Sequence, residues 1–396
     1  MAQEPTQKKP GLLELLDEWE KQGASDAEIM EWTRKYLSYS AREKGVPLRG
    51  TFELTPLCNL NCKMCYVHLS DKQLRESGKR LLTVDEWKNI MQQAIDAGMI
   101  GAILTGGEAM LYPGFDDLYL FLQEKGIEIT VKTNGLLMTE ERIEFFKAHE
   151  PTGIQITLYG SDDDTYEKVT GHRCFGRVID AIERIKQVSL CLEVMITPNR
   201  YMIQDMEGLL AKINDLGVKY QIGSGLFVPR DETGRGNESH DMTLDEYVAL
   251  YKLEAKLKNR TLKPVCVDEN DRKELSQQSE VGLRCGAARD GFAVNWCGDM
   301  MPCFSLEKIC VNLLTEPFDK AWSELNRAVT VIPIPSECNG CTYQRLCPTC
   351  VVQHAYGAPP GHANPFFCTR ARRLVAEGIY TVTNINKMER SIEHEK

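Results

Sequence analysis

The sequence has no long apolar run. Nowhere in its 396 residues do about 18 consecutive apolar residues occur, which is the length that a membrane-spanning helix requires. The first ten residues, MAQEPTQKKP, lack the apolar centre of a signal peptide. An excess of basic residues is also missing, and the formal net charge of -10 disfavours nonspecific binding to nucleic acid. We therefore expect a cytoplasmic protein that binds neither membranes nor nucleic acid.

Disulfide bonds are a poor explanation for the 15 cysteines of the chain, because the cytoplasm keeps thiols reduced. Most of these cysteines fall in two groups, which favours ligation of metal by thiolates. The remaining composition, with 42% hydrophobic and 26% charged residues, is that of an ordinary globular protein. The length allows one large α/β domain and a smaller one.

Alternating strand-like and helix-like segments fill the first half of the chain. Residues 11–42 have the apolar spacing of two amphipathic helices, after which short apolar runs alternate with helical patterns. Successive strand-helix units predict a parallel sheet, and six units predict an open, partial (β/α)6 barrel of the TIM type. Active sites in such sheets lie at the carboxyl ends of the strands. The predicted strands are 51–55, 101–105, 127–132, 153–158, 190–196 and 218–223.

Changes in composition divide the chain into five segments. Residues 229–242 are polar and rich in turn formers, which is typical of a boundary loop. Two further helical patterns, near 243–258 and 268–279, and a cysteine-rich region follow. We predict an N-terminal helical segment (1–48), a partial barrel (49–228), a linker with helices (229–281), a cysteine-rich domain (282–375) and a C-terminal helix or tail (376–396).

Three cysteines lie on one short loop directly after the first predicted strand. Cys58, Cys62 and Cys65 have the spacing Cys-x3-Cys-x2-Cys in LTPLCNLNCKMCYV. Three thiolates can hold three irons of a four-iron cluster and leave the fourth iron open to a substrate. A zinc site would require a fourth ligand, and His68 is more typical of a surface residue. The pattern therefore favours a catalytic iron-sulfur site.

This spacing resembles the signature of the radical S-adenosylmethionine (radical SAM) enzymes. The resemblance implies a [4Fe-4S] cluster whose open iron binds S-adenosylmethionine. Enzymes of this family cleave that cofactor reductively to a 5'-deoxyadenosyl radical, which abstracts hydrogen from the substrate. In this family an aromatic residue usually precedes the last thiolate and packs on adenine, whereas this chain has Met64, a polarizable side chain that can also cover a ring.

Further motifs of the same family end the later strands. Gly106, Gly107 and Glu108 follow the second strand and resemble the motif that binds the amino group of the cofactor, although Ala109 stands where proline is common. Thr133-Asn134-Gly135 resembles a family turn, and we interpret it as architectural or as a turn that lies under the cofactor.

The resemblance also implies cofactor contacts at the fourth and fifth strands. These contacts involve Thr157, Thr197 and Asn199. Tyr159 replaces an aspartate that relatives often carry, so the role of that acid does not transfer.

The second cysteine group lies between residues 285 and 368 and contains two Cys-x2-Cys pairs. Two such pairs could form a zinc ribbon. The group also resembles the SPASM domain, an auxiliary iron-sulfur extension of radical SAM enzymes. That resemblance implies two auxiliary [4Fe-4S] clusters, although relatives usually place three residues where two separate Cys347 from Cys350. The implied ligands are Cys285, Cys303 and Cys350 for one cluster and Cys338, Cys341, Cys347 and Cys368 for the other, with Cys297, or else Cys310 or Cys266, as an eighth thiol.

We predict a radical SAM/SPASM maturase that acts on a ribosomal peptide or a protein side chain. The modification it introduces is a cross-link, a thioether, an oxidation or an epimerisation. A sulfatase-maturing role is less expected, because Phe304 replaces the aspartate that those relatives carry after the second SPASM cysteine. The alternatives are a radical SAM oxidoreductase acting on a small metabolite or cofactor precursor, and a non-enzymatic electron-transfer or zinc-scaffold protein.

The expected partners of the enzyme are a peptide or protein substrate, an electron donor such as flavodoxin or ferredoxin, and a separate leader-peptide-binding protein. No catalytic acid or base emerges from the sequence. His172, Arg173, Tyr159 and Arg235 are polar residues near strand ends that more often have structural or positioning roles.

Overall fold

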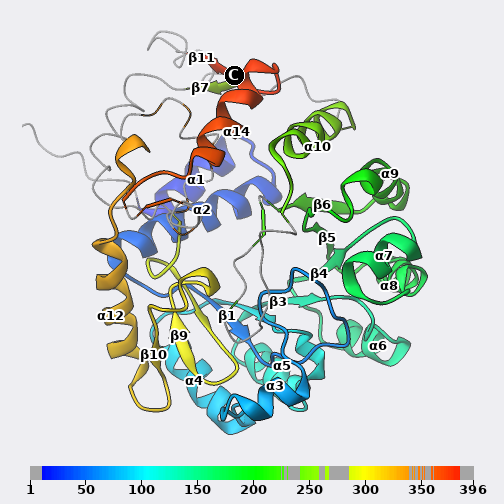
Figure 1. Cartoon of the computed structure of the whole chain (residues 1–396). Coiled ribbons are helices and arrows are strands. Elements are labelled where there is room, and N and C mark those ends of the chain that lie inside the picture. Colours follow the sequence, from blue (N-terminus) through cyan, green and yellow to red (C-terminus); the bar gives the residue numbers. More distant parts are fainter. Residues whose placement is uncertain are drawn as a thin grey trace, which may run out of the picture.

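A mainly parallel sheet forms the centre of the molecule (Figure 1). Within the residues that the computed structural model describes, this sheet has nine strands in the order β10-β9-β8-β1-β2-β3-β4-β5-β6. The described residues are 11–223, 225, 226, 230, 241–257, 264–266, 285–338, 341, 343, 347, 350, 352, 358, 359 and 361–383.

The first six strands all run parallel and pair in chain order, so the predicted partial barrel of (β/α)6 type is confirmed. Helices cover the outer face of the curved sheet (Figure 1). The strands are β1 (Arg49–Glu53), β2 (Gly101–Thr105), β3 (Glu128–Thr133), β4 (Gly153–Leu158), β5 (Leu192–Ile196) and β6 (Lys219–Ile222). The helices between and after them are α3 (Asp71–Glu76), α4 (Val84–Asp96), α5 (Phe115–Glu124), α6 (Glu140–Ala148), α7 (Asp163–Thr170), α8 (Phe175–Gln187), α9 (Met206–Leu216) and α10 (Leu244–Leu257).

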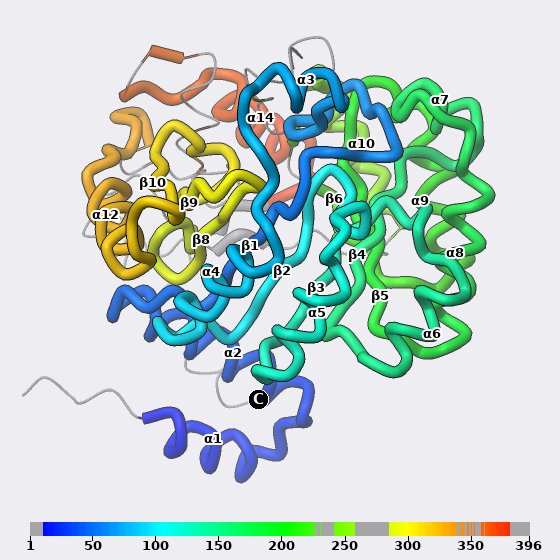
Figure 2. Tube along the Cα trace, turned by 90° about the horizontal axis from the view of Figure 1, so that it is seen from below, coloured from blue at the N-terminus to red at the C-terminus, as the bar shows by residue number. Residues whose placement is uncertain are grey.

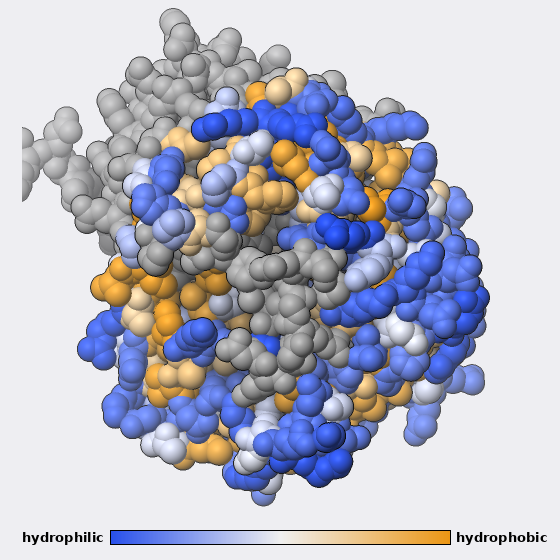
Figure 3. Space-filling view, viewed as in Figure 1, coloured by the Kyte–Doolittle hydropathy of each residue, from blue (hydrophilic) through white to orange (hydrophobic). Residues whose placement is uncertain are grey.

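Capping boxes and amphipathic faces explain why these helices begin and pack where they do. In α4 the Thr83 hydroxyl accepts from the Glu86 N–H, and the Glu86 carboxylate accepts in return from the Thr83 N–H. The same helix buries Trp87 against Phe52 of β1, with ring centroids 6.0 Å apart and nearly perpendicular planes. The outer faces of α7, α8 and α9 are mainly hydrophilic (Figure 3). The helices thus pack their apolar faces on the buried sheet and expose polar faces to solvent.

The cysteine-rich region adds strands to the β1 side of the sheet. The first of them, β8 (Gly291–Val294), pairs parallel with β1, and β9 (Asp299–Met301) and β10 (Val311–Asn312) continue antiparallel. The sheet therefore crosses the domain boundary predicted near residue 282. The helices of this region are α12 (Phe318–Thr330) and α14 (Pro365–Ala376), and a separate two-stranded sheet joins β7 (Pro264–Cys266) to β11 (Thr381–Thr383).

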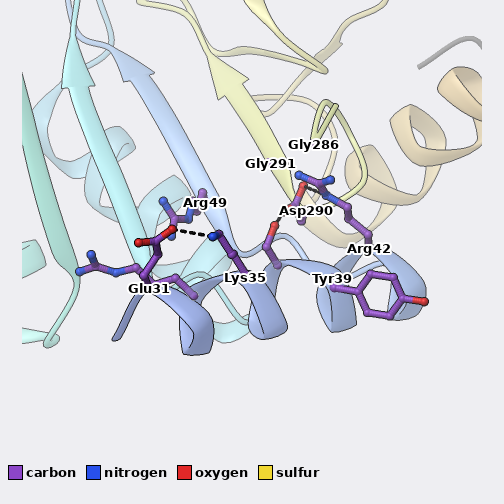
Figure 4. A pocket seen from close by; sticks show the side chains of 10 residues that line it. Glu31, Lys35, Tyr39, Arg42, Arg49, Gly286, Asp290 and Gly291 are labelled. Atoms are coloured by element: carbon purple, nitrogen blue, oxygen red, sulfur yellow. Dashed lines mark hydrogen bonds and ion pairs between the residues drawn. The ribbon is translucent and has the colours of Figure 1, made fainter. Parts of the chain in front are cut away.

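The N-terminal helices α1 (Leu12–Lys21) and α2 (Asp26–Lys44) confirm the two helices predicted for residues 11–42. Figure 2 shows α2 beneath the strands, on the side where they begin. Ser38 and Arg42 of α2 both bind the buried carboxylate of Asp290, just before β8. A polar pocket lies between α2 and the first residues of β1 and β8, where Arg42 points to Asp290 (Figure 4). This pocket is at the opposite edge of the sheet from the carboxyl ends of the strands.

Two predicted features fall on residues that the structure does not describe. The helix expected at 268–279 and the boundary loop near 229–242 lie almost entirely outside the described residues. The domain boundaries stay a prediction. Of the helices expected after residue 242, the one at 243–258 corresponds to α10.

No helix among the described residues is both long and apolar enough to cross a membrane.

Candidate functional site

The loop with Cys58, Cys62 and Cys65 follows β1 at the carboxyl edge of the sheet. Its start is joined to β2 by the Leu54 N–H, which donates to the Thr105 carbonyl at 2.9 Å. Its middle is held by the end of α7, where the carbonyls of Thr170 and Val169 accept from the N–H groups of Asn61 and Lys63 at 2.9 and 3.0 Å. The three thiols therefore sit on a loop whose backbone is fixed by neighbouring elements.

Gly106 and Gly107 let the end of β2 lie directly against this loop. The Gly107 N–H donates to the Thr55 carbonyl at 2.8 Å, and the Glu108 N–H donates to the Leu57 carbonyl at 2.9 Å. A Cβ atom would lie 2.5 Å from the Thr55 oxygen at Gly106 and 2.4 Å from the Leu57 oxygen at Gly107. Only glycine permits so close an approach of the two backbones.

Glu108 ties the ends of β2 and β3 together. Its Oε2 accepts from the Thr133 hydroxyl and from the Asn134 N–H, both at 2.9 Å, while Oε1 accepts from the Met110 N–H at 3.3 Å. The residue is buried, and this burial raises the pKa of its carboxyl group despite the three hydrogen bonds. A carboxylate has about four acceptor positions, so Oε1 retains capacity for a further donor. The predicted contact of Glu108 with an ammonium group stays a prediction.

Asn134 contacts the cysteine loop, which the sequence analysis missed by treating this turn as architectural. Its Nδ2 donates to Asn59 Oδ1 at 2.6 Å and lies 3.7 Å from Cys58 Sγ. The following Gly135 has φ of +85°, which lets the backbone turn away after β3. The signal available in the sequence was the position of Asn134 at the end of a strand next to the Gly-Gly-Glu motif.

The three thiols share one electrostatic environment. Burial raises the pKa of Cys58 to about 12, and the negative charges of Glu108 and Cys65 act in the same direction. The pKa of Tyr159 is raised by burial and then by the charges of Cys62, Cys65 and Cys58.

Backbone N–H groups favour the thiolate forms of this loop. The Leu60 N–H lies 3.4 Å from Cys58 Sγ, and the His68 N–H lies 3.3 Å from Cys65 Sγ. Three cysteine sulfurs, two of them with such donors, are the ligand type that iron-sulfur clusters require, so the residues of this loop fit a cluster. Among the described residues, no group of three or more His, Cys, Asp or Glu side chains is arranged around a single metal ion.

The other predicted cofactor residues differ in how open they are. Thr157 and Thr197, at the ends of β4 and β5, are half-buried. Met64 is only 6% exposed and packs in the main hydrophobic core. Asn199 is fully buried, and its amide donates to the Thr197 carbonyl and accepts from the Tyr201 N–H, both at 3.1 Å. A cofactor contact therefore requires rearrangement at Met64 and Asn199, but not at the two threonines.

The structure brings Cys285, Cys303 and Cys350 together. The pKa of Cys303 rises to about 11 through burial and then through the nearby charges of Cys285 and Cys350. Cys285 and Cys303 line a cavity on the inner side of the sheet together with Thr51 of β1 and Phe304. This grouping matches the ligand set that the resemblance to SPASM domains implied.

The remaining four predicted ligands form a second group around α14. Their cavity is lined by Cys338, Cys341, Cys347 and Cys368. The pKa of Cys347 rises to about 12 through burial and then through the charges of the other three thiols, while Arg370 lowers it. The roles of these seven thiols as cluster ligands stay a prediction.

Cys297 lies at the turn between β8 and β9, with its sulfur 3.2 Å from Asn295 Oδ1 and 3.3 Å from Asp299 Oδ2. The whole of β9 separates it from Cys303, and an extended strand places the residues at its two ends far apart. This separation disfavours Cys297 as the eighth thiol, and its role as a ligand stays a prediction.

The structure places two of the other polar candidates just after α7. Arg173 pairs with Asp164 and Glu167 on α7. His172 lies in the turn that follows α7, and Arg235 lies outside the described residues. A buried pair that the sequence analysis did not identify, Glu53 with Arg230, lies next to the cysteine loop.

Comparison with known proteins agrees with this geometry. Residues 52–213 match the model of the radical SAM superfamily. The AdoMet-dependent heme synthase of Methanosarcina barkeri is 24% identical over 78% of this chain and 91% of its own length. A second relative is the antilisterial bacteriocin subtilosin biosynthesis protein AlbA of Bacillus subtilis, which is 23% identical over 66% of this chain. The matched region covers 56% of the length of that relative.

A solved structure shares the fold over most of both chains. The crystal structure of Streptococcus suis SuiB bound to its precursor peptide SuiA has a TM-score of 0.62 at 18% identity and covers 86% of this chain and 80% of that one. The cysteine loop, the Gly-Gly-Glu turn and the match of residues 52–213 all fall on the partial barrel. Residues 52–213 of the chain therefore form a radical SAM domain, and a cysteine-rich C-terminal extension follows it.

Proposed function

We propose that this enzyme modifies a ribosomally made peptide or a protein side chain by abstracting a hydrogen atom from it. The observation that carries the proposal is the loop of Cys58, Cys62 and Cys65, fixed against Gly106, Gly107 and Glu108 at the carboxyl edge of the sheet. When bound, a [4Fe-4S] cluster and S-adenosylmethionine supply the 5'-deoxyadenosyl radical that this reaction requires.

The residues around the loop have distinct tasks in this proposal. The three thiolates hold the cluster. Asn134 orients the first of them, because its side-chain amide donates to Asn59 Oδ1 and lies next to Cys58 Sγ. Glu108 offers its remaining acceptor capacity to the ammonium group of the cofactor. Thr157 and Thr197 offer hydroxyl groups at the carboxyl edge of the sheet, where we expect the ribose and the carboxylate of the cofactor.

The two further thiol groups hold auxiliary [4Fe-4S] clusters in this proposal. Cys285, Cys303 and Cys350 supply three ligands to the first, which leaves an iron position open, and the other four thiols supply the second. Such clusters can accept the electron that a substrate radical loses when an oxidised or cross-linked product forms. We assign the supply of electrons to a donor such as flavodoxin or ferredoxin. We place the protein in the cytoplasm, which contains such donors.

Several relatives support a peptide substrate. Their names include a sporulation killing factor maturation protein and PqqA peptide cyclases, and solved neighbours are bound to a precursor peptide or to other peptides. We also propose that a separate protein recognises the leader peptide.

A second candidate function is radical chemistry on a small cofactor precursor. Its supporting observation is the long alignment with the heme synthase, which covers 91% of that relative. A short reading frame beside the gene, encoding a peptide rich in Cys, Trp, Tyr or Lys, would favour the peptide substrate over this alternative.

The first experiment is anaerobic reconstitution with iron and sulfide, followed by iron quantitation and assay of 5'-deoxyadenosine under reducing conditions. The Cys58→Ala/Cys62→Ala/Cys65→Ala variant should lose cofactor cleavage and keep the auxiliary irons. Cys191→Ala changes an exposed cysteine outside all three groups and should cleave as the unchanged chain does. Cleavage that survives in the triple variant would overturn the assignment of the site.

The second experiment identifies the substrate class. The reconstituted enzyme is incubated with the peptide encoded beside its gene, and the product is analysed by mass spectrometry. A loss of two hydrogen masses indicates a cross-link or thioether, and an unchanged mass with deuterium uptake from heavy water indicates epimerisation. An unmodified peptide, with cofactor cleavage intact, would favour the small-molecule alternative.

A further inference from the structure

Arg230 makes a buried, bidentate ion pair inside the barrel. It is 5% exposed, and its Nη1 and Nη2 lie 2.7 and 2.8 Å from the two carboxylate oxygens of Glu53, which is fully buried at the end of β1. This fork-to-fork geometry is the strongest form of arginine-carboxylate pairing. Arg230 therefore has one fixed orientation at the base of the cysteine loop.

The same arginine contacts the segments that follow two different cysteine sites. Its backbone N–H donates to the Tyr66 carbonyl at 3.2 Å, directly after Cys65. The guanidinium group lies 5.8 Å from the Tyr66 ring and 5.4 Å from the Phe304 ring, directly after Cys303. These two rings lie 6.1 Å apart.

A second carboxylate completes the contacts on the far side. Glu307, four residues beyond Cys303, has its Oε2 3.1 Å from Arg230 Nε. Burial by itself lowers the pKa of Arg230, but the charges of Glu53 and Glu307 raise that pKa above its ordinary value. The guanidinium is therefore a permanent positive charge.

We propose that Arg230 is a positioning residue that ties the loop of residues 58–69 to residues 303–307 and places one cation between the first cysteine site and the Cys303 site. The part of the proposal that concerns bound clusters rests on the proposed function. The tie itself depends only on the contacts of Arg230 with Glu53, Tyr66, Phe304 and Glu307.

A cation at this position has a predictable electrostatic effect. Reduction adds a negative charge to a cluster, and a nearby positive charge stabilises that state more strongly in a buried environment than in water. Arg230 should therefore raise the midpoint potentials at both sites. A residue with a purely structural role at one site would not do so.

The electrostatic test compares two variants that differ by one charge. Both carry Glu53→Gln, so that no buried carboxylate is left unpaired, and Arg230 is changed to Lys in one and to Met in the other. In the reconstituted full-length chain, titration followed by electron paramagnetic resonance should give more negative midpoint potentials at both sites for Met than for Lys. Equal potentials in the two variants, or a shift at one site alone, would overturn the proposal.

Arg142 provides the matched control. It also pairs with a carboxylate, that of Asp116, and lies 5.0 Å from the ring of Phe145, but it sits on the outer helices of the barrel. Arg142→Met should leave both potentials unchanged. A change there equal to that of the Arg230 variant would show that the potentials report general damage to the fold.

Hydrogen exchange tests the tie without any need for cofactor cleavage. In Arg230→Ala/Glu53→Gln, amides in both 58–69 and 303–309 should exchange at least about tenfold faster than in the unchanged chain, which corresponds to about 1.4 kcal/mol of lost local stability. Unchanged exchange in either segment would refute the tie. If the chain binds no clusters, the proposed function fails while this measurement still decides the structural claim.

Discussion

Substitution of Gly107 by alanine tests whether the close contact between the second strand and the cysteine loop shapes the site. A Cβ atom there would lie 2.4 Å from the Leu57 carbonyl oxygen, whereas ordinary van der Waals contact begins near 3.4 Å. The two backbones would have to separate by about 1 Å, and the hydrogen bonds to Thr55 and Leu57, of 2.8 and 2.9 Å, would be lost or stretched.

The expected cost follows from these contacts. Two backbone hydrogen bonds contribute about 1 kcal/mol each, and overpacking adds about 1–3 kcal/mol. We therefore expect Gly107→Ala to lower the free energy of unfolding by about 3–5 kcal/mol. Urea unfolding of the chain, followed by circular dichroism, measures this quantity, and iron content after reconstitution measures the effect on the site.

Gly101 is the matched control, because it begins the same strand. A Cβ atom at Gly101 meets nothing closer than 3.7 Å, so Gly101→Ala should change the free energy of unfolding by less than about 1 kcal/mol. Equal unfolding free energies for the two variants would refute the argument that Gly107 is required by the approach of the loops.

Three further predictions concern named side chains. Asn134→Ala should reduce iron retention at the first site by about 10–100-fold, because it removes a group that orients Cys58, and competition with a chelator measures the loss. Burial raises the pKa of Glu108 in the folded chain, so the stability that its protonated form contributes is full below pH 4.5 and is lost as the pH rises through the raised pKa. Glu108→Gln should flatten this part of the pH profile of the free energy of unfolding, as measured by urea unfolding. Cys303→Ala and Cys347→Ala should each abolish one auxiliary cluster signal, whereas Cys297→Ala should abolish neither, as iron quantitation and electron paramagnetic resonance can show.

The strands and helices of the barrel could be predicted because local patterns specify them. The capping box at Thr83 and Glu86 places the start of α4 at Val84, and the apolar run 153–158 coincides with β4. The short helix α7 was missed. Its eight residues lie between Asp162 and Gly171, too short a stretch for a clear helical period, yet its end holds the cysteine loop through Val169 and Thr170.

Pairings between distant segments could not be predicted. Strand β8 pairs with β1 although more than 200 residues separate them. No local pattern in its sequence, GFAV, predicts a parallel partner. Arg230 was missed for the same reason, since Glu53 lies 177 residues away. Contacts of this kind depend on how layers pack, which a linear pattern does not encode.

Local patterns in the chain were enough to indicate the expected chemistry, because the spacing of cysteines on a loop limits which thiols can share one cluster. They also indicated the order of strands and helices, because apolar periodicity is a property of neighbouring residues. Three spatial relations required the folded chain: Cys297 lies apart from Cys303, Asn134 contacts Cys58, and one buried arginine contacts the segments after two cysteine sites. The reason is physical: a folded chain brings together residues that are far apart in sequence, and it can also hold near neighbours at opposite ends of an extended strand.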